Sequence, residues 1–128
     1  MFKKITPVFI VDAIEPVLPL WDALGFTRAA EVPAGNALGF VMLQRDGIEV
    51  MYQTFASVRT DEPRSLDGKR AVGASGVFIV VDRLDDVAPL VPPNTDIIER
   101  RRETFYGAIE MIVRDAAGNV VVFAEMKA

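Results

Sequence analysis

Few side chains in this sequence are suited to acid–base or metal chemistry. The 128 residues include no histidine and no cysteine. Histidine is the usual general base near neutral pH and the commonest metal ligand, and cysteine supplies thiolates for zinc. Their absence disfavours most hydrolase triads and most zinc or iron sites. The remaining acid–base candidates are Glu49, Glu110, Glu125 and Tyr106, and their spacing in the sequence marks no pair of them.

The dipeptide Asp46-Gly47 predicts a hairpin that fixes which residues share a face. A two-residue loop of this type places Arg45 opposite Ile48 and sets every pair beyond. Opposed residues lie on the same face of a sheet. One face gathers apolar residues that should pack on a helix: Val41, Leu43, Ile48, Val50 and Tyr52. The other face is mixed and is expected to line a cleft: Phe40, Met42, Gln44, Glu49, Met51 and Gln53.

A second hairpin is predicted at Ala116-Ala117-Gly118, a three-residue loop with its glycine in the left-handed conformation, which pairs Asp115 with Asn119. Its cleft-side face contains Tyr106, Ala108, Glu110, Ile112, Arg114, Val120, Val122 and Ala124. Aromatic and methionine surface with a few carboxylates and amides is typical of small-molecule pockets. The predicted ligand-binding residues are Phe40, Met42, Glu49, Met51, Gln53, Tyr106, Glu110 and Arg114.

Two questions about these faces stay open. Phe40, Met42 and Met51 either line a cleft or fill a collapsed core. Glu110 is costly to bury in an otherwise apolar strand unless something pairs with it, either a ligand cation or Arg114 four residues further on. A carboxylate among apolar side chains attracts a cation more strongly than one in bulk water. An aromatic, neutral or cationic organic molecule is therefore the expected ligand.

An internal repeat positions both faces. Residues 11–20 align without gaps on residues 81–90, at an offset of 70, with Val, Asp, Val, Pro and Leu recurring. Each copy predicts a buried strand, an acidic N-cap and a short helix whose prolines fit only near its first turn. Three strands should follow each helix, at 26–32, 38–45 and 48–55 in the first copy and at 96–104, 106–114 and 119–125 in the second.

The repeat predicts one α+β domain over residues 1–128. It consists of two tandem β-α-β-β-β modules, at about 5–55 and 74–126, joined by a charged surface linker at 56–73. The net charge of −4 has the wrong sign for a protein that holds nucleic acid by its phosphates. The sequence also has neither an apolar run near the ~20 residues of a membrane-spanning helix nor a signal peptide. We therefore expect a cytoplasmic protein with no nucleic-acid and no membrane partner.

The motifs along the chain resemble the vicinal oxygen chelate superfamily, which includes glyoxalases, bleomycin resistance proteins and extradiol dioxygenases. The opening segment 7–12, the pair Leu20-Trp21 and the turn Leu24-Gly25-Phe26 are similar to the start of that fold, and residues 105–110 and 114–119 are similar to its closing signature. The resemblance implies that each module curls into half a barrel around a small-molecule cleft. It also implies a homodimer, because a second copy usually covers the open edges and the partly apolar cleft in this superfamily.

Metal-dependent members of that superfamily hold a divalent ion with four side chains from the first and last strands of each module. The strand patterns carry these positions over to Thr6, Met51, Gly76 and Val122. None is a carboxylate or an imidazole, which an oxygen-preferring cation requires. The resemblance is thus to the metal-free, bleomycin-resistance-like members, and no metal or cofactor is expected. Whether Glu49, Glu110 or Glu125 contacts a non-standard metal stays open.

Three functions are compatible with the sequence. The first is a metal-independent protein that binds a small molecule and sequesters an antibiotic or another aromatic or cationic compound. The second is a divergent enzyme of the superfamily, a lyase, isomerase, dioxygenase or transferase. The third is a dimeric interaction module, since a fold does not dictate a function. The missing metal ligands, the absence of histidine and the acidic balance favour the first.

Overall fold

The computed structural model describes residues 1–65, 73 and 75–127. The first module contains β1 (Val8–Val11), a 3-10 turn η1 (Glu15–Val17), α1 (Leu18–Ala23), β2 (Thr27–Ala34), β3 (Ala37–Arg45) and β4 (Ile48–Thr54). The second contains β5 (Gly76–Val81), α3 (Leu84–Val87), η3 (Ala88–Leu90), β6 (Asp96–Glu103), β7 (Ala108–Arg114) and β8 (Val120–Met126). Between them lie α2 (Phe55–Asp61) and η2 (Pro63–Ser65).

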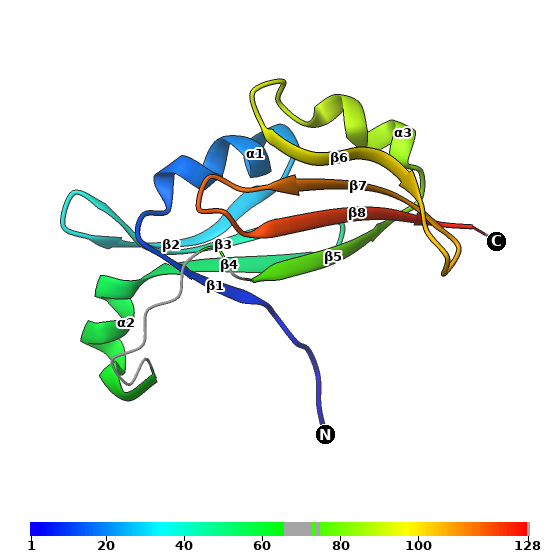
Figure 1. The fold of residues 1–128 in the computed structure, drawn as a ribbon. Coiled ribbons are helices and arrows are strands. Elements are labelled where there is room, and N and C mark those ends of the chain that lie inside the picture. The colour runs from blue at the N-terminus through cyan, green and yellow to red at the C-terminus, as the bar shows by residue number, and fades with distance from the viewer. Residues whose placement is uncertain (66–72, 74, 128) are drawn as a thin grey trace.

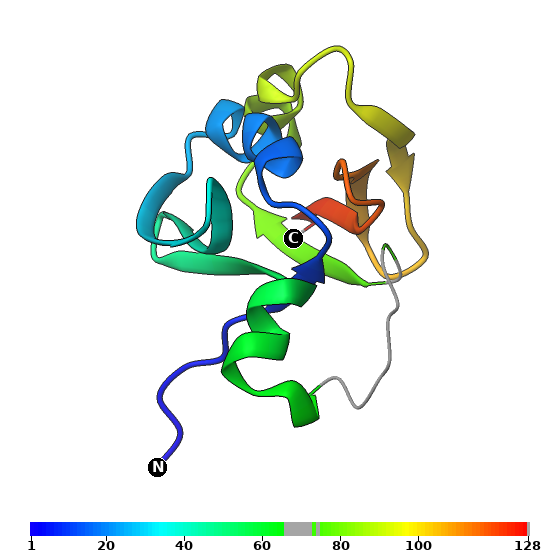
Figure 2. The same ribbon diagram turned by 90° about the vertical axis from the view of Figure 1, so that its left-hand side faces the viewer.

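Each module forms a four-stranded mixed sheet of the same topology. The strand orders are β1-β4-β3-β2 and β5-β8-β7-β6. The first strand of each module runs parallel to the last, and the remaining neighbours are antiparallel. Figures 1 and 2 show α1 and α3 on the same side of the molecule, next to both sheets. The predicted α+β class and the duplicated module are confirmed, and the described strands form two open sheets rather than a closed barrel.

The helices that follow β1 and β5 are short, as the prolines predict. Pro16 lies in a 3-10 turn before α1, and Pro89 lies in the 3-10 turn that continues α3. The predicted acidic N-caps are wrong. The N-cap positions are Ile14 for η1 and Arg83 for α3, and neither side chain forms a capping hydrogen bond. The Glu15 carboxylate instead accepts a hydrogen bond from the backbone N–H of Leu38, at 2.7 Å, and so ties the helix start to β3.

The segment predicted as a linker begins with a helix. The Thr54 hydroxyl accepts a hydrogen bond from the N–H of Ser57, at 3.1 Å, and so caps the start of α2. Phe55 and Val58 are buried on its inner side, which explains why a charged segment is helical here. The rest of the predicted linker, residues 66–72 and 74, lies outside the described residues. Within the described residues, no helix is long and apolar enough to cross a membrane.

The two sheets turn their apolar faces toward one shared core. Val41, Leu43, Val50 and Tyr52 of the first sheet are buried as predicted. They belong to the same cluster as four residues of the second sheet, Met111, Val113, Val121 and Phe123. Trp21 of α1 is fully buried in this cluster, and Phe9 of β1 is almost completely buried there. The exception is Ile48, predicted to lie with the apolar face, which is 44% exposed at the end of the hairpin.

A chain of hydrogen bonds joins the modules through this core. The Trp21 indole N–H donates to the Tyr52 hydroxyl at 3.0 Å, and that hydroxyl donates to Asp115 Oδ2 at 2.7 Å. Asp115 Oδ1 accepts from the N–H groups of Ala117 and Asn119, which closes the β7–β8 loop. All three side chains are buried, so each needs these partners. The Tyr52–Asp115 bond spans 63 residues of sequence and is a direct polar link between the modules.

We predict that Tyr52→Phe lowers the free energy of unfolding by about 1 to 3 kcal/mol, because the Trp21 N–H and Asp115 each lose a buried partner. Burial, with Asp115 adding to it, raises the pKa of Tyr52 far above its usual range. The folded state therefore keeps a proton that the unfolded state releases above its ordinary pKa near ~10, and stability falls as pH rises beyond that point, by about 1.4 kcal/mol per unit.

Urea denaturation between pH 7 and pH 11 measures both effects. The parent should lose stability more steeply than Tyr52→Phe above the ordinary tyrosine pKa, because the variant has no hydroxyl there to titrate. Tyr106, the other tyrosine of the chain, is present in both proteins and cancels in the comparison. Equal alkaline slopes for the two proteins would contradict the assignment.

Candidate functional site

The first sheet presents its mixed face outside the core. The Asp46-Gly47 turn has both residues in the left-handed conformation, and Arg45 pairs with Ile48, which confirms the predicted register. Three cross-strand pairs form the face: Phe40 with Gln53, Met42 with Met51, and Gln44 with Glu49. All six residues are partly buried, and none belongs to the core cluster. Exposed Val8 and Val32 extend this apolar surface beside Met51 and Phe40, respectively.

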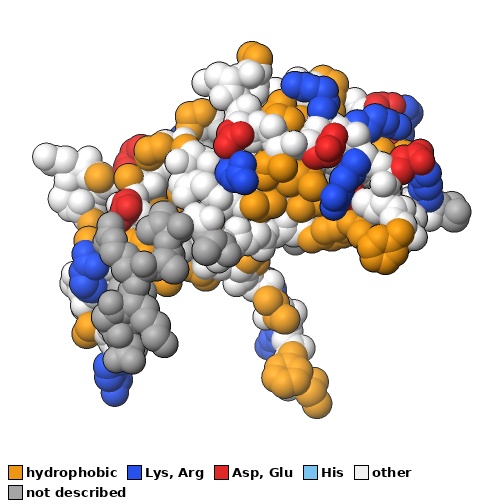
Figure 3. Space-filling view, viewed as in Figure 1, with side chains coloured by type: hydrophobic (Ala, Val, Ile, Leu, Met, Phe, Trp, Pro, Cys, Tyr) orange, Lys and Arg blue, Asp and Glu red, His pale blue; other side chains and the backbone are white. Residues whose placement is uncertain are grey.

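The second sheet has an equivalent outer face. Asp115 and Asn119 close the β7–β8 loop with Gly118 at a φ of 91°, as predicted. Ile112 lies opposite Val122, and Val122 lies opposite Phe78 of β5. Phe78, Val80 and Tyr106 are exposed, and Figure 3 shows hydrophobic side chains gathered on this side of the molecule beneath pairs of acidic and basic side chains. A large apolar surface of this kind marks a binding or association site.

One chain does not bring the two faces together around a ligand. The opposite side of each sheet packs into the shared core, where Tyr52 of one module bonds Asp115 of the other. The mixed face of the first sheet and the outer face of the second therefore both point away from that core. The residues predicted to form one cleft thus lie in two separate groups: Phe40, Met42, Glu49, Met51 and Gln53 on the first sheet, and Tyr106 and Glu110 on the second.

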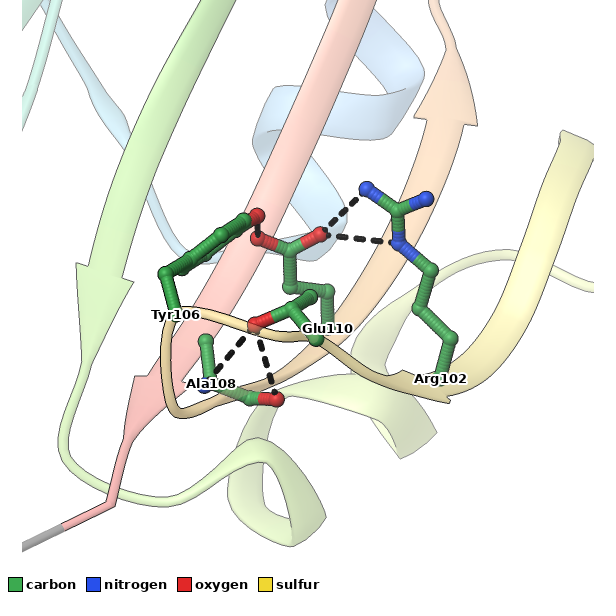
Figure 4. Close-up of polar contacts among 5 residues, drawn as sticks. Arg102, Tyr106, Ala108 and Glu110 are labelled. Atoms are coloured by element: carbon green, nitrogen blue, oxygen red, sulfur yellow. Dashed lines mark hydrogen bonds and ion pairs between the residues drawn. The ribbon is translucent and has the colours of Figure 1, made fainter.

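Glu110 is the most deeply buried charged residue of the second group. Its side chain is 1% exposed, and Arg102 of β6 donates from Nε and Nη2 to its Oε1, at 3.0 and 2.9 Å. The Tyr106 hydroxyl donates to Oε2, so both carboxylate oxygens have a partner (Figure 4). The hydrogen bond to Glu110 raises the pKa of both Tyr106 and Arg102. The cluster therefore fixes the Tyr106 ring at the outer face and keeps its phenol protonated near neutral pH.

Arg114 is not the partner of Glu110. It lies at the end of β7, is exposed, and pairs with Asp96 at 3.5 Å. It lines a cavity of about 260 Å³ between the α1 region and the β6–β7 end, away from Glu110. The β6 register instead places Arg102 opposite Glu110, and β6 is an edge strand, as expected for a run of arginines. Side chains alternate between the two faces of a strand, and this alternation along residues 100–102 is the sequence signal that could have identified Arg102 as the partner of Glu110.

Glu49 differs from Glu110 in that one of its oxygens has no partner. Its side chain is 6% exposed, and Lys4 of the N-terminal segment forms a short ion pair with Oε2. Oε1 is buried without a hydrogen-bond partner among the described residues. The bond from Lys4 lowers the pKa of Glu49, so this carboxyl group is ionised at neutral pH. The involvement of Lys4 was not predicted, because no local pattern connects positions 45 residues apart.

Four positions correspond to the metal ligands of metal-dependent members of the resembled superfamily, and the residues at these positions do not fit a divalent ion. The parallel registers pair Met51 with Val8 and Val122 with Phe78, so Thr6 and Gly76 lie two residues from those pairs. Neither arrangement supplies the carboxylates or imidazoles that such an ion prefers. Glu125 accepts a hydrogen bond from the N–H of Leu84 at 2.8 Å, which engages it at the start of α3. Within the described part of the chain, no three His, Cys, Asp or Glu residues gather as a metal site would require.

Comparison with known proteins identifies the fold. No protein-family model and no curated protein matches the sequence significantly. TioX from Micromonospora sp. ML1 is 20% identical, with a TM-score of 0.72 over 95% of this chain and 98% of its own. A glyoxalase/bleomycin resistance protein/dioxygenase family enzyme from Burkholderia phytofirmans PsJN is 13% identical, with a TM-score of 0.73 over 94% and 96%. The bleomycin resistance determinant encoded on the transposon Tn5 is 12% identical, with a TM-score of 0.68 over 99% and 100%.

The chain therefore has the fold of the glyoxalase, bleomycin resistance and dioxygenase proteins over nearly its whole length. The resemblance drawn from its opening and closing motifs is confirmed at this level. At such low sequence identity, the structural similarity establishes the fold alone, and the function must be argued from the site itself.

The contacts of Glu110 lead to a stability prediction. Glu110→Gln leaves Arg102 without its anionic partner, and we expect it to lower the free energy of unfolding by about 1 to 3 kcal/mol. In a double-mutant cycle with Arg102→Met, the two substitutions should be coupled by roughly 0.5 to 2 kcal/mol, a range that allows for the 49% exposure of Arg102. Chemical denaturation of the four proteins measures the coupling. Arg101→Met, which removes an exposed pair with Asp85, is the matched control, and additive effects of Glu110→Gln and Arg102→Met would be inconsistent with the pair.

Proposed function

We propose that this protein is a cytoplasmic, metal-independent binding protein that acts as a homodimer and takes up an aromatic or otherwise apolar organic molecule, such as an antibiotic. The observation that carries the proposal is the pair of outward-facing apolar surfaces, one on each sheet. The first offers Phe40, Met42 and Met51, and the second offers Ile112 and Tyr106. Polarisable methionine and aromatic surface is suited to flat or irregular apolar ligands.

A dimer explains how these two surfaces reach one ligand. In a two-fold dimer, the mixed face of the first sheet of one copy lies against the outer face of the second sheet of the other, and the symmetry produces two equivalent clefts. The same contact covers apolar residues that a lone chain exposes to water, among them Phe78 and Val80. Each ligand would then be held by Met42 and Met51 of one copy and by Tyr106 of its partner.

The charges of the two faces bear on the ligand. Glu110 is bonded to Arg102 and Tyr106, and Glu49 is bonded to Lys4. Beside Tyr106, a cationic ligand must compete with Arg102 for Glu110, whereas a neutral aromatic molecule need not. The proposed cleft therefore favours neutral aromatic ligands, with the Tyr106 hydroxyl and the Gln53 amide as hydrogen-bond partners. A thermal-shift screen of neutral and cationic aromatic compounds tests this order of preference.

The contacts also support binding over acid–base catalysis. Glu110 has both oxygens bonded, and the Tyr106 phenol has a raised pKa, which makes it a poor proton donor near neutral pH. Glu125 accepts a hydrogen bond from the Leu84 N–H, which engages one of its oxygens at the start of α3. The bleomycin resistance determinant of Tn5, which shares the fold, is by its name a resistance protein.

The shared cleft leads to a complementation experiment. Met42→Lys on the first sheet and Ile112→Lys on the second should each abolish binding of a screened ligand, because either substitution puts a charge in both clefts of its homodimer. When the two variants are mixed and allowed to exchange, each mixed dimer contains one cleft with no substitution and one with both. Calorimetry should then recover about a quarter of the parent's sites in an equal mixture.

Light scattering provides the first control, with an expected mass of twice the 14.1 kDa of one chain. Asp61→Lys, at the exposed end of α2, is the matched charge control and should bind as the parent does. A monomeric mass at micromolar concentration, or no recovery on mixing, would refute the shared cleft.

Metal independence is tested by elemental analysis. Protein grown in medium supplemented with zinc, iron, nickel and manganese should contain well below one equivalent of each per chain, because the positions nearest the inherited ligand set are occupied by Thr6, Val8, Met51, Gly76, Phe78 and Val122. Ligand affinity should also be the same before and after treatment with a chelator. One tightly held equivalent of any of these metals would sink this part of the proposal.

A further inference from the structure

A separate cavity lies where the two modules meet. It occupies about 380 Å³ between the start of β4 and the strand β5. Because β1 pairs only with Met51–Thr54, the first residues of β4 have no strand on that side. The walls come from both modules and are almost wholly apolar: Pro7, Trp21, Phe26, Ile48, Val50, Val77, Phe78, Ile79 and Val80. We refer to this space as the junction cavity.

The junction cavity shares Glu49, Phe78 and Val80 with the surfaces of the proposed dimer, but its other walls differ from those of the proposed cleft. Phe40, Met42, Met51, Tyr106 and Glu110 do not line it. A second hollow of about 370 Å³ adjoins it and shares Phe26, Ile48, Ile79 and Val80, and charged residues also line this second space: Arg45, Asp46, Asp82, Arg83 and Asp86. Both volumes are in the range of sites that bind small organic molecules.

Glu49 is the single charged residue among those lining the junction cavity. Its Oε1 atom is buried and forms no hydrogen bond within the described residues, although Lys4, with Gln44 and Thr6 adding to it, lowers the pKa of the group and keeps it ionised at neutral pH. A buried acceptor left without a hydrogen bond is costly, and more so when it is charged. The protein therefore carries, at one end of an apolar cavity, a carboxylate oxygen that a ligand's donor would satisfy.

The cation already at Glu49 is held by a segment that can give way. Lys4 is 62% exposed and belongs to residues 1–5, which are exposed, form no helix or strand and extend away from the body of the molecule (Figures 1 and 2). Its neighbours Phe2 and Ile5 are almost fully exposed and anchor nothing. An ion pair with so exposed a lysine contributes little stability. A ligand cation can thus bind Oε1 beside Lys4 or displace it.

We propose that the junction cavity is a second binding site, and that it takes a compact hydrophobic molecule bearing a primary ammonium group. The ammonium binds Glu49, and the hydrocarbon body lies against Phe26, Ile48 and Ile79. An anion is excluded by the charge of Glu49, and a neutral molecule gains no ion pair with it. The inference does not rest on the proposed cleft, since the walls belong to one chain and no dimer is needed.

The single tryptophan of the chain, Trp21, lines the cavity and is a built-in reporter. The probe is 1-aminoadamantane, which is cationic at neutral pH and does not absorb where tryptophan does, and its neutral counterpart is 1-adamantanol. Titration of the ammonium should change Trp21 fluorescence, with calorimetry giving the affinity. We expect Glu49→Gln to weaken the ammonium by about tenfold or more and to leave the alcohol within about twofold.

Matched variants separate the possible outcomes. Lys4→Ala should tighten the ammonium by up to about fivefold, since it removes the competing cation, and Lys3→Ala should have no effect. Ile48→Phe should fill the cavity and block both probes; Ile48 is exposed, so the core is not disturbed. Glu99→Gln on β6 controls for the change in net charge, and thermal melts confirm that each variant is folded.

The cleft variant Met42→Lys decides between the two sites. It should leave the ammonium bound at the junction cavity while abolishing ligands of the cleft. If Met42→Lys abolishes ammonium binding, the probe sits in the cleft and the junction site is refuted, whereas the proposed function stands. If Glu49→Gln binds the ammonium as tightly as the parent, or if neither probe affects Trp21 at millimolar concentration, the junction site is overturned as well. If the junction site behaves as expected but the complementation experiment fails, the shared cleft is refuted and the junction site is still supported.

Discussion

The hydrogen bond from Tyr52 to Asp115 is the constraint on which the arrangement of the modules depends. Both groups are buried, and Asp115 also closes the β7–β8 loop, so neither can shift without losing other bonds. Apolar packing alone tolerates sliding, because dispersion contacts have little directionality, whereas a buried polar network is stable in only one geometry. Trp21, bonded to the same hydroxyl, extends the constraint to α1. The modules are thereby fixed with their helix-covered faces together.

Fixing the modules in this way has consequences for the surface. The faces turned inward bury Leu43, Tyr52 and Met111, and the faces turned outward must then expose Phe78 and Val80. A chain that functioned alone would be expected to carry polar residues on those outer faces, since alternation along a strand makes this easy. Both outer faces nevertheless carry apolar residues, Met42 and Met51 among polar neighbours on the first sheet and Phe78 and Val80 on the second. This argues that something else covers them, and two-fold association does so while creating a space for a ligand.

The sequence predicts those features that are set by neighbours along the chain and misses those that are set across it. The Asp46-Gly47 turn determines the β3–β4 register within a few residues, so the faces carrying Met42 and Leu43 follow directly. The linker was predicted without α2 because its cap depends on a strand ending at Thr54 rather than at Phe55. Lys4, Arg102 and Asp115 were missed as partners because their contacts depend on strand order, a register shift in β6 and module packing.

The two buried glutamates show how one residue type acquires two roles. Glu110 has an arginine on one oxygen and a phenol on the other, so every acceptor is satisfied and the residue stabilises the position of Tyr106. Glu49 has an exposed lysine on one oxygen, and its other oxygen is buried with no hydrogen bond within the described residues, although Gln44 and Thr6 also help to lower its pKa. A ligand gains nothing by approaching the first, because it must break bonds as good as those it forms. At the second it supplies a hydrogen bond that Oε1 does not form within the described part of the chain, so the cost of leaving that acceptor unsatisfied is recovered on binding.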